Sequence, residues 1–511
     1  MSTTDTMSTT TTTTGVEHVD MLIVGAGLSG IGAAWHLQDK RPGTSYAILE
    51  ARGAMGGTWD LFRYPGIRSD SDLSTFAYAF KPWTGENAIA DGPEILEYIR
   101  ETAADNGIDE HIRYGHKVVR ASWSTEDARW TVEAERADTG ETVRMTAGFL
   151  FAASGYYRYD EGFTPRFEGT EDFTGQIVHP QLWPEDIDVA GKRVVVIGSG
   201  ATAVTLIPAL AAQDAHVTML QRSPSYIMSL PSRDVIADRL RRWFGDERGH
   251  ALTRRKNIFQ QRKVYAFCQR YPKLARRLIR RLTEKQLPAH IDVDTHFNPT
   301  YDPWDQRLCA VPNGDLFRAL RAGKADIVTD GIERFTEKGL RLSSGRELEA
   351  DIIVTATGLN LQLFGGAELE VDGHVMVPAE TLAYKGLMLS GVPNFAFAIG
   401  YTNSSWTLKV DLVCEYLCRL LDHMEARGQR TVVPVDPNPG QATRPLMDFS
   451  AGYVQRAIAQ LPRQGAAAPW HLAMDYAEDV AHLRGAPIAD GALRFDAAAP
   501  AAAPRETGVA A

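Results

Sequence analysis

The sequence predicts an α/β fold with two dinucleotide-binding domains and a helical insertion in the second of them. Three observations predict it: a strand–glycine turn–helix pattern, a second copy of that pattern, and a long basic segment after the second copy. The 511 residues are enough for two to four domains, and an apolar fraction of 44% is ordinary for a globular protein. The formal net charge of −10 gives no reason to expect a nucleic-acid-binding protein.

The first pattern reads VDMLIVGAGLSGIGAAWHL, an apolar strand, a glycine turn and a helix. Gly25, Gly27 and Gly30 have the G-x-G-x-x-G spacing, which allows a tight turn, lets the backbone approach a pyrophosphate and lets the helix pack closely on the strand. The free N–H groups of the helix N-terminus then face the anion. The next strand ends at Glu50, whose carboxylate can accept hydrogen bonds from a ribose diol. This unit predicts a dinucleotide site.

The second copy reads GKRVVVIGSGATAVTLIPAL and has the spacing G-x-G-x-x-A on Gly198, Gly200 and Ala203. The strand after it ends in Gln221 and Arg222, without an acidic residue. The missing carboxylate removes repulsion against a 2′-phosphate, and the arginine supplies a partner for it. Two such Rossmann-like units predict FAD at the first site and NADPH at the second.

Two further apolar strands close on small residues, FAASG at 151–155 and DIIVTATG at 351–358, and we interpret them as the crossings between the domains. The predicted organisation is an FAD domain in two parts, 19–155 and 351–496, around an NADPH domain at 156–350. The ends of the chain, 1–18 and 497–511, have the composition of disordered tails. The first 18 residues contain no Lys or Arg and no apolar run, so they do not predict a secretory signal. We expect a cytoplasmic protein.

The stretch FTGQIVHPQLWP lies between the first crossing and the second glycine turn. It resembles the F-x-G-x-x-x-H-x-x-x-W-P fingerprint of the Baeyer–Villiger monooxygenases, on Phe173, Gly175, His179, Trp183 and Pro184. In that family the fingerprint couples domain motion to catalysis. The resemblance therefore implies a hinge motif here, and the Pro after His179 favours an extended backbone at that histidine.

The resemblance extends over about 18–494. The segment GGTWDLFRYPGIRSDSD is similar to the flavin-facing loop of the family and places Asp70 opposite a catalytic arginine. The segment YDPWDQRLCAVPNGDLF is similar to the one that supplies this arginine, here Arg307. Many family members have Lys before it, whereas this chain has Gln306, so we expect NADPH preference to depend mainly on Arg222.

The resemblance implies a monooxygenase that uses FAD, NADPH and O2. It would insert one oxygen atom into small apolar ketones to give esters or lactones, and oxygenate sulfides or thioamides to S-oxides, through a C4a-peroxyflavin. Arg307 would stabilise the anionic oxidant and Asp70 would hold Arg307. The candidate cofactor-binding residues are Gly25, Gly27, Ser29, Gly30, Glu50, Thr58, Trp59, Asp60, Leu61, Arg68, Ser69, Asp70 and Val118 for FAD, and Gly198, Ser199, Gly200, Ala201, Thr202, Ala203, Arg222 and Ser223 for NADPH.

Other function classes have less support in the sequence. A disulfide reductase needs a C-x4-C pair at the flavin, and the four cysteines are too scattered to provide it. No His or Cys pair has metal-ligand spacing with a partner cluster, so we expect no metal site. Two alternatives stay open: a flavin N- or S-monooxygenase outside the Baeyer–Villiger group, and an NADPH-sensing flavoprotein without oxygenation.

The segment from Arg239 to Gln286 carries 16 Lys or Arg against 3 Asp or Glu. It is too long for a loop, and Leu274, Leu278, Ile279 and Leu282 have helical spacing, so we predict a helical insertion at about 235–290. One interpretation is a solvated basic face over a small apolar core. The other is a face that docks on anionic lipid and gives apolar substrates a route from the membrane.

Overall fold

The computed structural model describes residues 15–306, 308–436, 438, 440 and 442–497. The predicted tails lie largely outside this range, except that strand β1 begins at Glu17 and strand β27 (Leu493–Ala497) ends at the edge of the second tail. Arg307 lies outside the described residues.

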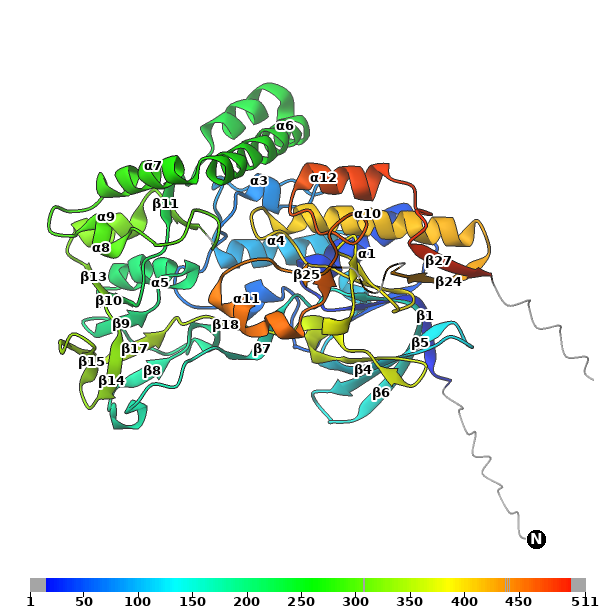
Figure 1. The fold of residues 1–511 in the computed structure, drawn as a ribbon, viewed down its shortest axis with the longest axis horizontal. Helices are drawn as coiled ribbons and strands as arrows, with labels where there is room; N and C mark the ends of the chain where they lie inside the picture. Colours follow the sequence, from blue (N-terminus) through cyan, green and yellow to red (C-terminus); the bar gives the residue numbers. More distant parts are fainter. Residues whose placement is uncertain (1–14, 307, 437, 439, 441, 498–511) are drawn as a thin grey trace, which may run out of the picture.

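The larger sheet has nine strands and is built from two separate parts of the chain (Figure 1). Its strands are β1 (Glu17–Val24), β2 (Tyr46–Leu49), β3 (Ile112–Arg113), β4 (His116–Ser124), β5 (Arg129–Arg136), β6 (Thr142–Ala152), β19 (Glu368–Val371), β20 (His374–Val375) and β23 (Phe395–Phe397). β1 pairs in parallel with both β2 and β6, and its four consecutive apolar residues 21–24 suit a strand covered on both faces. β19 and β23, from the later part of the chain, pair with β4 and β6.

The smaller sheet has five parallel strands in the order β13 (Ala325–Thr329), β10 (His216–Gln221), β9 (Arg193–Ile197), β17 (Ile352–Thr355) and β8 (Gln176–Val178). A three-stranded antiparallel sheet, β14 (Ile332–Thr336), β15 (Gly339–Leu342) and β16 (Glu347–Glu349), packs beside it. The two stretches that connect the sheets pair with each other as β7 (Tyr157–Gly162) and β18 (Leu359–Leu361). The predicted fold class, two Rossmann-like units with a helical insertion, is therefore confirmed.

Helices cover both sheets. The larger sheet packs against α1 (Leu28–Lys40), α4 (Gly92–Asp105) and α10 (Trp406–Glu425), which bury a common apolar core with it. The smaller sheet packs against α5 (Ala201–Ala212) and α9 (Asp315–Arg321). Shorter helices are α2 (Thr58–Leu61), α3 (Leu73–Phe76), α8 (Val293–His296), α11 (Gly452–Ala457) and α12 (Tyr476–Val480). Two-stranded ladders join β11 (Ile227–Leu230) to β12 (Cys309–Pro312), β21 (Ala383–Tyr384) to β22 (Met388–Leu389), β24 (Gln429–Pro434) to β27, and β25 (Arg444–Pro445) to β26 (Arg463–Gln464).

The predicted insertion consists of α6 (Val235–Arg270) and α7 (Pro272–Glu284), which lie along one edge of the molecule (Figure 1, green). Gly245 has a positive φ of 77° and bends α6 into two arms. Of the four apolar residues whose spacing predicted a helix here, Ile279 is buried, whereas Leu274, Leu278 and Leu282 are exposed. The leucines lie one position around the helix from the buried stripe of Ala275, Ile279 and Thr283.

In the part of the chain that the structure describes, no helix combines the length and the apolar character that crossing a bilayer requires.

Candidate dinucleotide sites

The first glycine turn connects β1 to α1 and leaves no room for a side chain at Gly25 or Gly30. Gly25 has a φ of 105°, and a Cβ there would lie 3.0 Å from the carbonyl oxygen of Ala153. A Cβ on Gly30 would lie 1.9 Å from the carbonyl oxygen of Gly25, so only glycine lets α1 approach the turn. The helix begins directly after Gly27, without a side-chain cap that would occupy its N–H groups. This is a cradle for an anion.

Glu50 follows β2 and is buried next to this turn. Its carboxylate accepts hydrogen bonds from the backbone N–H of Ala26 at 2.8 Å and of Arg52 at 3.0 Å. Burial raises the pKa of Glu50 above its usual range, while these two hydrogen bonds and the Arg52 charge oppose the rise. The carboxylate is thus fixed at the end of the strand, and it lines the cavity described next.

A cavity of about 370 Å³ extends from this turn to the N-terminus of α10. Of the predicted FAD residues, it is lined by Gly25, Gly27, Ser29, Glu50, Thr58, Trp59, Asp70 and Val118. The buried hydroxyl of Ser154 also lines it and has no hydrogen-bond partner among the described residues. A long cavity with a glycine cradle, a fixed carboxylate at the strand end and an unused hydroxyl fits FAD.

The other predicted FAD residues surround the cavity without lining it. Asp60 is buried and forms ion pairs with Arg52 at 2.7 Å and with Arg63 at 2.9 Å. The Ser69 hydroxyl accepts a hydrogen bond from the backbone N–H of Ala90 at 3.3 Å. Gly30 is the close-approach glycine, and Leu61 packs against the apolar core of the smaller sheet.

Arg68 contacts the other half of the molecule. Its guanidinium lies 2.5 Å from the carboxylate of Asp315, the first residue of α9. This ion pair joins the loop beside the first site to the element that follows the Arg307 segment. Asp70, two residues later, is exposed and lines the cavity, whereas its predicted partner Arg307 lies outside the described residues.

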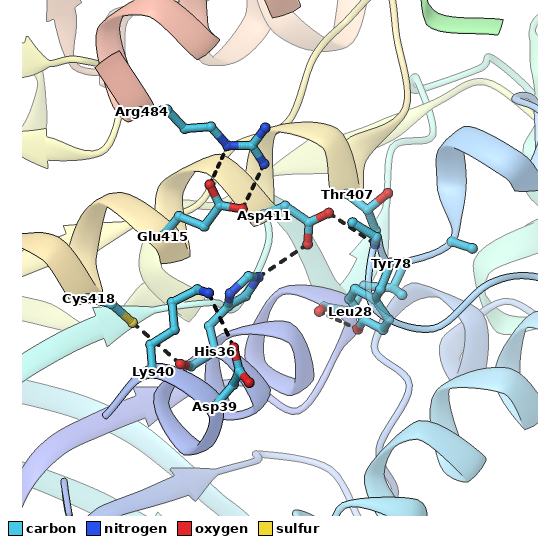
Figure 2. Close-up of polar contacts among 12 residues, drawn as sticks. Leu28, His36, Asp39, Lys40, Tyr78, Thr407, Asp411, Glu415, Cys418 and Arg484 are labelled. Carbon is cyan, nitrogen blue, oxygen red and sulfur yellow. Dashed lines mark hydrogen bonds and ion pairs between the residues drawn. The ribbon is translucent and has the colours of Figure 1, made fainter. Parts of the chain in front are cut away.

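Two helices fix the position of the first site (Figure 2). His36 of α1 and Asp411 of α10 are both buried, with 3.4 Å between His36 Nε2 and the carboxylate. The Tyr78 hydroxyl donates to the carbonyl oxygen of Leu28, in the first turn of α1, at 2.6 Å. At the cavity itself, Trp406 Nε1 donates to the Ser29 hydroxyl at 2.8 Å. The first turn of α1 is therefore held from both sides.

The second glycine turn connects β9 to α5. Gly198 has a φ of 140°, and a Cβ there would lie 2.3 Å from the carbonyl oxygen of Ala356. A Cβ on Gly200 would meet nothing within 4 Å, so the turn opens to solvent at this residue. Ala203 is fully buried at the position of the third glycine. The Ser199 hydroxyl donates to the carbonyl oxygen of Ser223 at 3.1 Å, which ties the turn to the end of β10.

Gln221 and Arg222 have opposite orientations at the end of β10. Gln221 is buried, and its amide donates to the carbonyl oxygen of His296 and to the hydroxyl of Thr329, both at 2.8 Å. Arg222 is exposed and makes no ion pair within the described part of the chain. The first polar group that reaches solvent after the strand is therefore a guanidinium, which fits a 2′-phosphate.

The loop beside the first site also contacts the second site through residues 64–66. The Tyr64 hydroxyl is hydrogen-bonded to Thr202, in the first turn of α5, and burial raises the pKa of this tyrosine to about 12. A Cβ on Gly66 would lie 2.8 Å from the Ala209 side chain and 3.0 Å from the Thr205 carbonyl oxygen. Ala201 begins the same helix. The segment 64–66 is thus packed against the helix of the second glycine turn.

His179 lies between the two connecting strands. Its Nε2 is 3.2 Å from the carbonyl oxygen of Gly358, and its Nδ1 accepts a hydrogen bond from the backbone N–H of Gln181. A Cβ on Gly162, at the end of β7, would lie 1.9 Å from the imidazole ring. Burial lowers the pKa of His179 below its usual range, so the ring is neutral near pH 7.

The other fingerprint residues lie on the same linker. Phe173 is buried against Phe335, and a Cβ on Gly175 would lie 2.4 Å from the Asp351 carbonyl oxygen. Trp183 is half-buried and lines a second cavity together with Pro184 and Arg63. The fingerprint therefore places the His179 ring between the connecting strands and the Trp183 ring beside the segment that contains Tyr64.

Sequence reasoning missed several residues of the first site. Tyr401 lines the cavity, and its hydroxyl donates to Asp479 at 2.6 Å; Asp479 in turn lies 2.8 Å from the ammonium group of Lys409. Tyr159 lines the cavity from β7, and burial raises its pKa to about 12 although Thr58 is hydrogen-bonded to it. These residues follow no spacing rule, because they come from separate parts of the chain.

Comparison with known proteins gives relatives along nearly the whole chain. The pyridine nucleotide-disulphide oxidoreductase family matches residues 22–244. The chain is 58% identical over 480 residues to the FAD-containing monooxygenase EthA of Mycobacterium tuberculosis (strain ATCC 25618 / H37Rv), which covers 94% of this chain and 98% of the relative. It is 47% identical over 481 residues to the probable FAD-binding monooxygenase AlmA of an Acinetobacter species, with 94% and 96% of the two chains covered.

Solved structures with the same fold include two monooxygenases. One is an oxidised steroid monooxygenase bound to NADP, with a TM-score of 0.72 and 22% identity over 94% of this chain and 100% of that one. The other is a cyclohexanone monooxygenase bound to ε-caprolactone, with a TM-score of 0.73 and 21% identity over the same shares of the two chains.

Proposed function

Because the chain belongs to the family of FAD-containing monooxygenases, we propose that it oxidises small apolar ketones to esters or lactones and oxygenates sulfides or thioamides to S-oxides. As a flavin monooxygenase it uses FAD, O2 and a small organic substrate, and the second glycine turn with Arg222 supports NADPH as the electron donor. The observation that carries the proposal is the cavity that joins the glycine cradle to Asp70 and Tyr401.

Bound NADPH and FAD would supply the hydride and the O2-activating ring, and the protein supplies position and charge. Gly25, Gly27, Ser29 and Glu50 would hold the dinucleotide part of FAD. Ser199, Thr202 and Arg222 would hold the phosphates of NADPH. Ser223 would add a further polar group to the second site. The hydrogen bond from the Ser199 hydroxyl to its carbonyl oxygen places it beside the glycine turn.

Asp70 and Arg307 would act at the reacting end of the cavity. Arg307 would stabilise the negative charge that develops on the reacting oxygen, a role for which one donor is typically worth about 3–4 kcal/mol. Asp70 would position the guanidinium. The neighbouring residue Asp305 is fixed by Ser450, whose hydroxyl donates to its carbonyl oxygen at 2.5 Å, so the chain is held two residues before Arg307.

Peripheral contact with a membrane through the α6–α7 insertion belongs to the same proposal, because apolar ketones and sulfides partition into lipid.

The test is aerobic turnover of the purified holoprotein with NADPH, a ketone panel and a sulfide panel, with product analysis. Esters or lactones from ketones support the proposal. S-oxides without any ester would favour a flavin S-monooxygenase outside the Baeyer–Villiger group, and NADPH oxidation without oxygenated product would favour the sensing function. In the same assay Arg307→Ala should keep flavin reduction by NADPH and lose oxygenated product. Product formation at the wild-type rate would exclude the role proposed for Arg307.

A further inference from the structure

The insertion exposes most of the large apolar side chains that the molecule leaves in solvent. In the described part of the chain seventeen such side chains are exposed, and twelve of them lie between Val235 and Leu282. They are Val235, Ile236, Trp243, Phe244, Leu252, Phe259, Val264, Phe267, Tyr271, Leu274, Leu278 and Leu282. Single exposed apolar residues are normal, whereas such a concentration marks an interaction surface.

α7 separates its apolar residues into two stripes. Ala275 and Ile279 face the protein and are buried. Leu274, Leu278 and Leu282 repeat every four residues and are 53%, 49% and 49% exposed. The core under α7 is thus complete without the leucines, and the outer stripe is available to a partner.

The long arm of α6 also has two faces. Its inner face holds the loop beside the first site: the side-chain amides of Asn257 and Gln261 donate to Asp72 at 2.7 Å and 2.6 Å. Its outer face exposes Leu252, Phe259 and Phe267. The ammonium group of Lys263 lies 5.3 Å from the Phe259 ring centroid, so charge and aromatic surface share this face.

The charges of the insertion divide in the same way. Six of its sixteen basic residues are bound to acidic, amide or backbone groups of the fold: Arg241, Arg254, Lys256, Arg262, Arg276 and Arg280. The other ten are exposed and make no ion pair with any described residue: Arg239, Arg242, Arg248, Arg255, Lys263, Arg270, Lys273, Arg277, Arg281 and Lys285. The apolar stripes therefore lie among unpaired cations.

We propose that the α6–α7 surface, residues 235–285, docks on an anionic phospholipid membrane. The exposed leucines and aromatic rings would enter the region between headgroups and acyl chains, and the unpaired arginines and lysines would bind lipid phosphates. The chain as a whole has a net charge of −10, so its remaining surface is acidic and would be repelled, which gives one docked orientation. A two-fold contact with a second copy would instead bring two basic surfaces together.

This inference deepens the proposed function, on which it rests only for the nature of the substrate. Because α6 holds Asp72 with its inner face, a docked surface would bring lipid-dissolved substrate to the element that supports the Asp70 loop.

The experiment is flotation of the purified full-length holoprotein with phosphatidylcholine vesicles that contain or lack phosphatidylglycerol. We expect binding to the anionic vesicles only, and weaker binding as salt is raised from about 0.05 to about 0.5 M. Arg277→Glu/Arg281→Glu should lower the partition coefficient by at least about 25-fold, since each basic residue near the surface contributes about fivefold. The matched control is Lys192→Glu/Lys338→Glu, which reverses two exposed charges elsewhere and should leave binding unchanged.

A second pair of variants tests the apolar stripe. Leu274→Ser/Leu278→Ser should lower binding by about tenfold or more, because the burial of each leucine in lipid is lost. Val375→Ser/Val377→Ser removes two equally exposed apolar side chains from another surface, at 55% and 47%, and should have no effect.

Three results would each overturn the docking surface. They are equal binding to neutral and anionic vesicles, a loss of binding in the control variants equal to that in the test variants, and protein that stays in the soluble fraction at low salt. An oligomer that dissociates on the Leu274/Leu278 change, without vesicle binding, would assign the surface to self-association and also overturn it. Turnover of a water-dissolved ketone or sulfide is measured in parallel without vesicles. Vesicle binding without turnover would refute the proposed reaction and support the docking surface. Turnover without vesicle binding would support the reaction and refute the docking surface.

Discussion

At the scale of single residues, Gln221 and Arg222 point in opposite directions at the end of β10, and on this we base the proposed preference of the second site for NADPH. Gln221 donates two hydrogen bonds into the protein, and Arg222 is left in solvent beside the glycine turn. A carboxylate at Gln221 would lose both donors, so the absence of an acid at this strand end is also a structural requirement. The sequence pattern predicted the arginine, whereas the reason for the glutamine appears only when His296 and Thr329 are brought next to it by the fold.

Replacing Arg222 by alanine should raise KM for NADPH by about tenfold or more and change KM for NADH much less, because only NADPH carries the 2′-phosphate. Steady-state kinetics with both cofactors measures the effect. Arg222→Lys is the control, since it keeps the charge and loses the bidentate geometry, and it should give an intermediate KM for NADPH. An equal change for both cofactors would exclude Arg222 as the group that distinguishes them.

At the scale of elements, α6 is held by buried polar groups to the half of the molecule that contains the first glycine turn. The guanidinium of Arg254 donates to the carbonyl oxygens of Ser74, Thr75 and Ala77, at 3.2, 3.1 and 2.6 Å, and lies 3.1 Å from the carboxylate of Asp411. An insertion within the second Rossmann-like unit is thereby attached to the first unit. The sequence shows Arg254 only as one of many basic residues in this segment. Nothing in it indicates that Arg254 is buried whereas Arg255 is exposed.

Arg254→Met should lower the free energy of unfolding by about 3–5 kcal/mol, because a buried carboxylate and three carbonyl groups lose their donor. Denaturant titration measures this as a lower midpoint. Arg255→Met is the matched control and should change the midpoint little, since it removes an exposed arginine from the same helix. A similar loss in both variants would mean that the helix tolerates no methionine here, and that the buried contacts are not the cause.

The same helix should make stability depend on pH through His250. Burial, together with the charges of Arg254 and Arg241, lowers the pKa of His250 from 6.5 to about 4. Because the pKa of His250 is lower in the folded protein than in the unfolded chain, protonation favours unfolding. The folded state therefore has its full stability above pH 6.5 and loses stability as the pH falls toward 4. At pH 5 the loss is on the order of 2 kcal/mol.

Thermal unfolding of the wild type and of His250→Gln between pH 7.5 and pH 5 tests this expectation. The wild type should lose more stability than the variant over this range. Parallel curves would show that other histidines with lowered pKa values, such as His179, account for the whole dependence.

At the scale of the whole molecule, the two sheets are joined by paired strands and by contacts between the two nucleotide loops. β7 and β18 form one ladder, with His179 beside it, and Tyr64 reaches the helix of the second glycine turn. The two halves are therefore in contact at several places. For this reason, removing a cofactor from one half should lower the stability of the whole molecule.

Removal of FAD should lower the thermal midpoint, because a ligand bound to the folded state alone stabilises it by about 2.7 kcal/mol at a free concentration of 100 times Kd. The purified protein should be yellow, with one non-covalent FAD, and the midpoint of the apoprotein should return when FAD is added back. Gly30→Ala should lose FAD, because its Cβ would lie 1.9 Å from a carbonyl oxygen; Gly43→Ala, where nothing lies within 4 Å, is the control. A midpoint unchanged by FAD would argue against the cavity as its site.

The fold was largely predictable, because glycine turns and apolar strands are local signals. The two Rossmann-like units and the helical insertion follow from Gly25, Gly198 and the basic segment. The candidate site was predictable only in part. Glu50 and Asp70 belong to motifs, whereas Tyr401 and Tyr159 reach the same cavity from distant segments. The spacing of the leucines in α7 predicted a helix but not that they face solvent, because helical spacing gives a stripe without its direction.

The split origin of the nine-stranded sheet also has a consequence for synthesis. Its first strand is β1, yet β19 and β23 come after the whole five-stranded sheet, which uses only residues 176–355. On the ribosome the chain emerges from its N-terminus, and domains fold as units once their residues are available. The five-stranded sheet is therefore the first to have all its strands, whereas the nine-stranded sheet, which contains β1, is complete only after Phe395–Phe397 has been synthesised. The half that begins the protein is the half that is finished last.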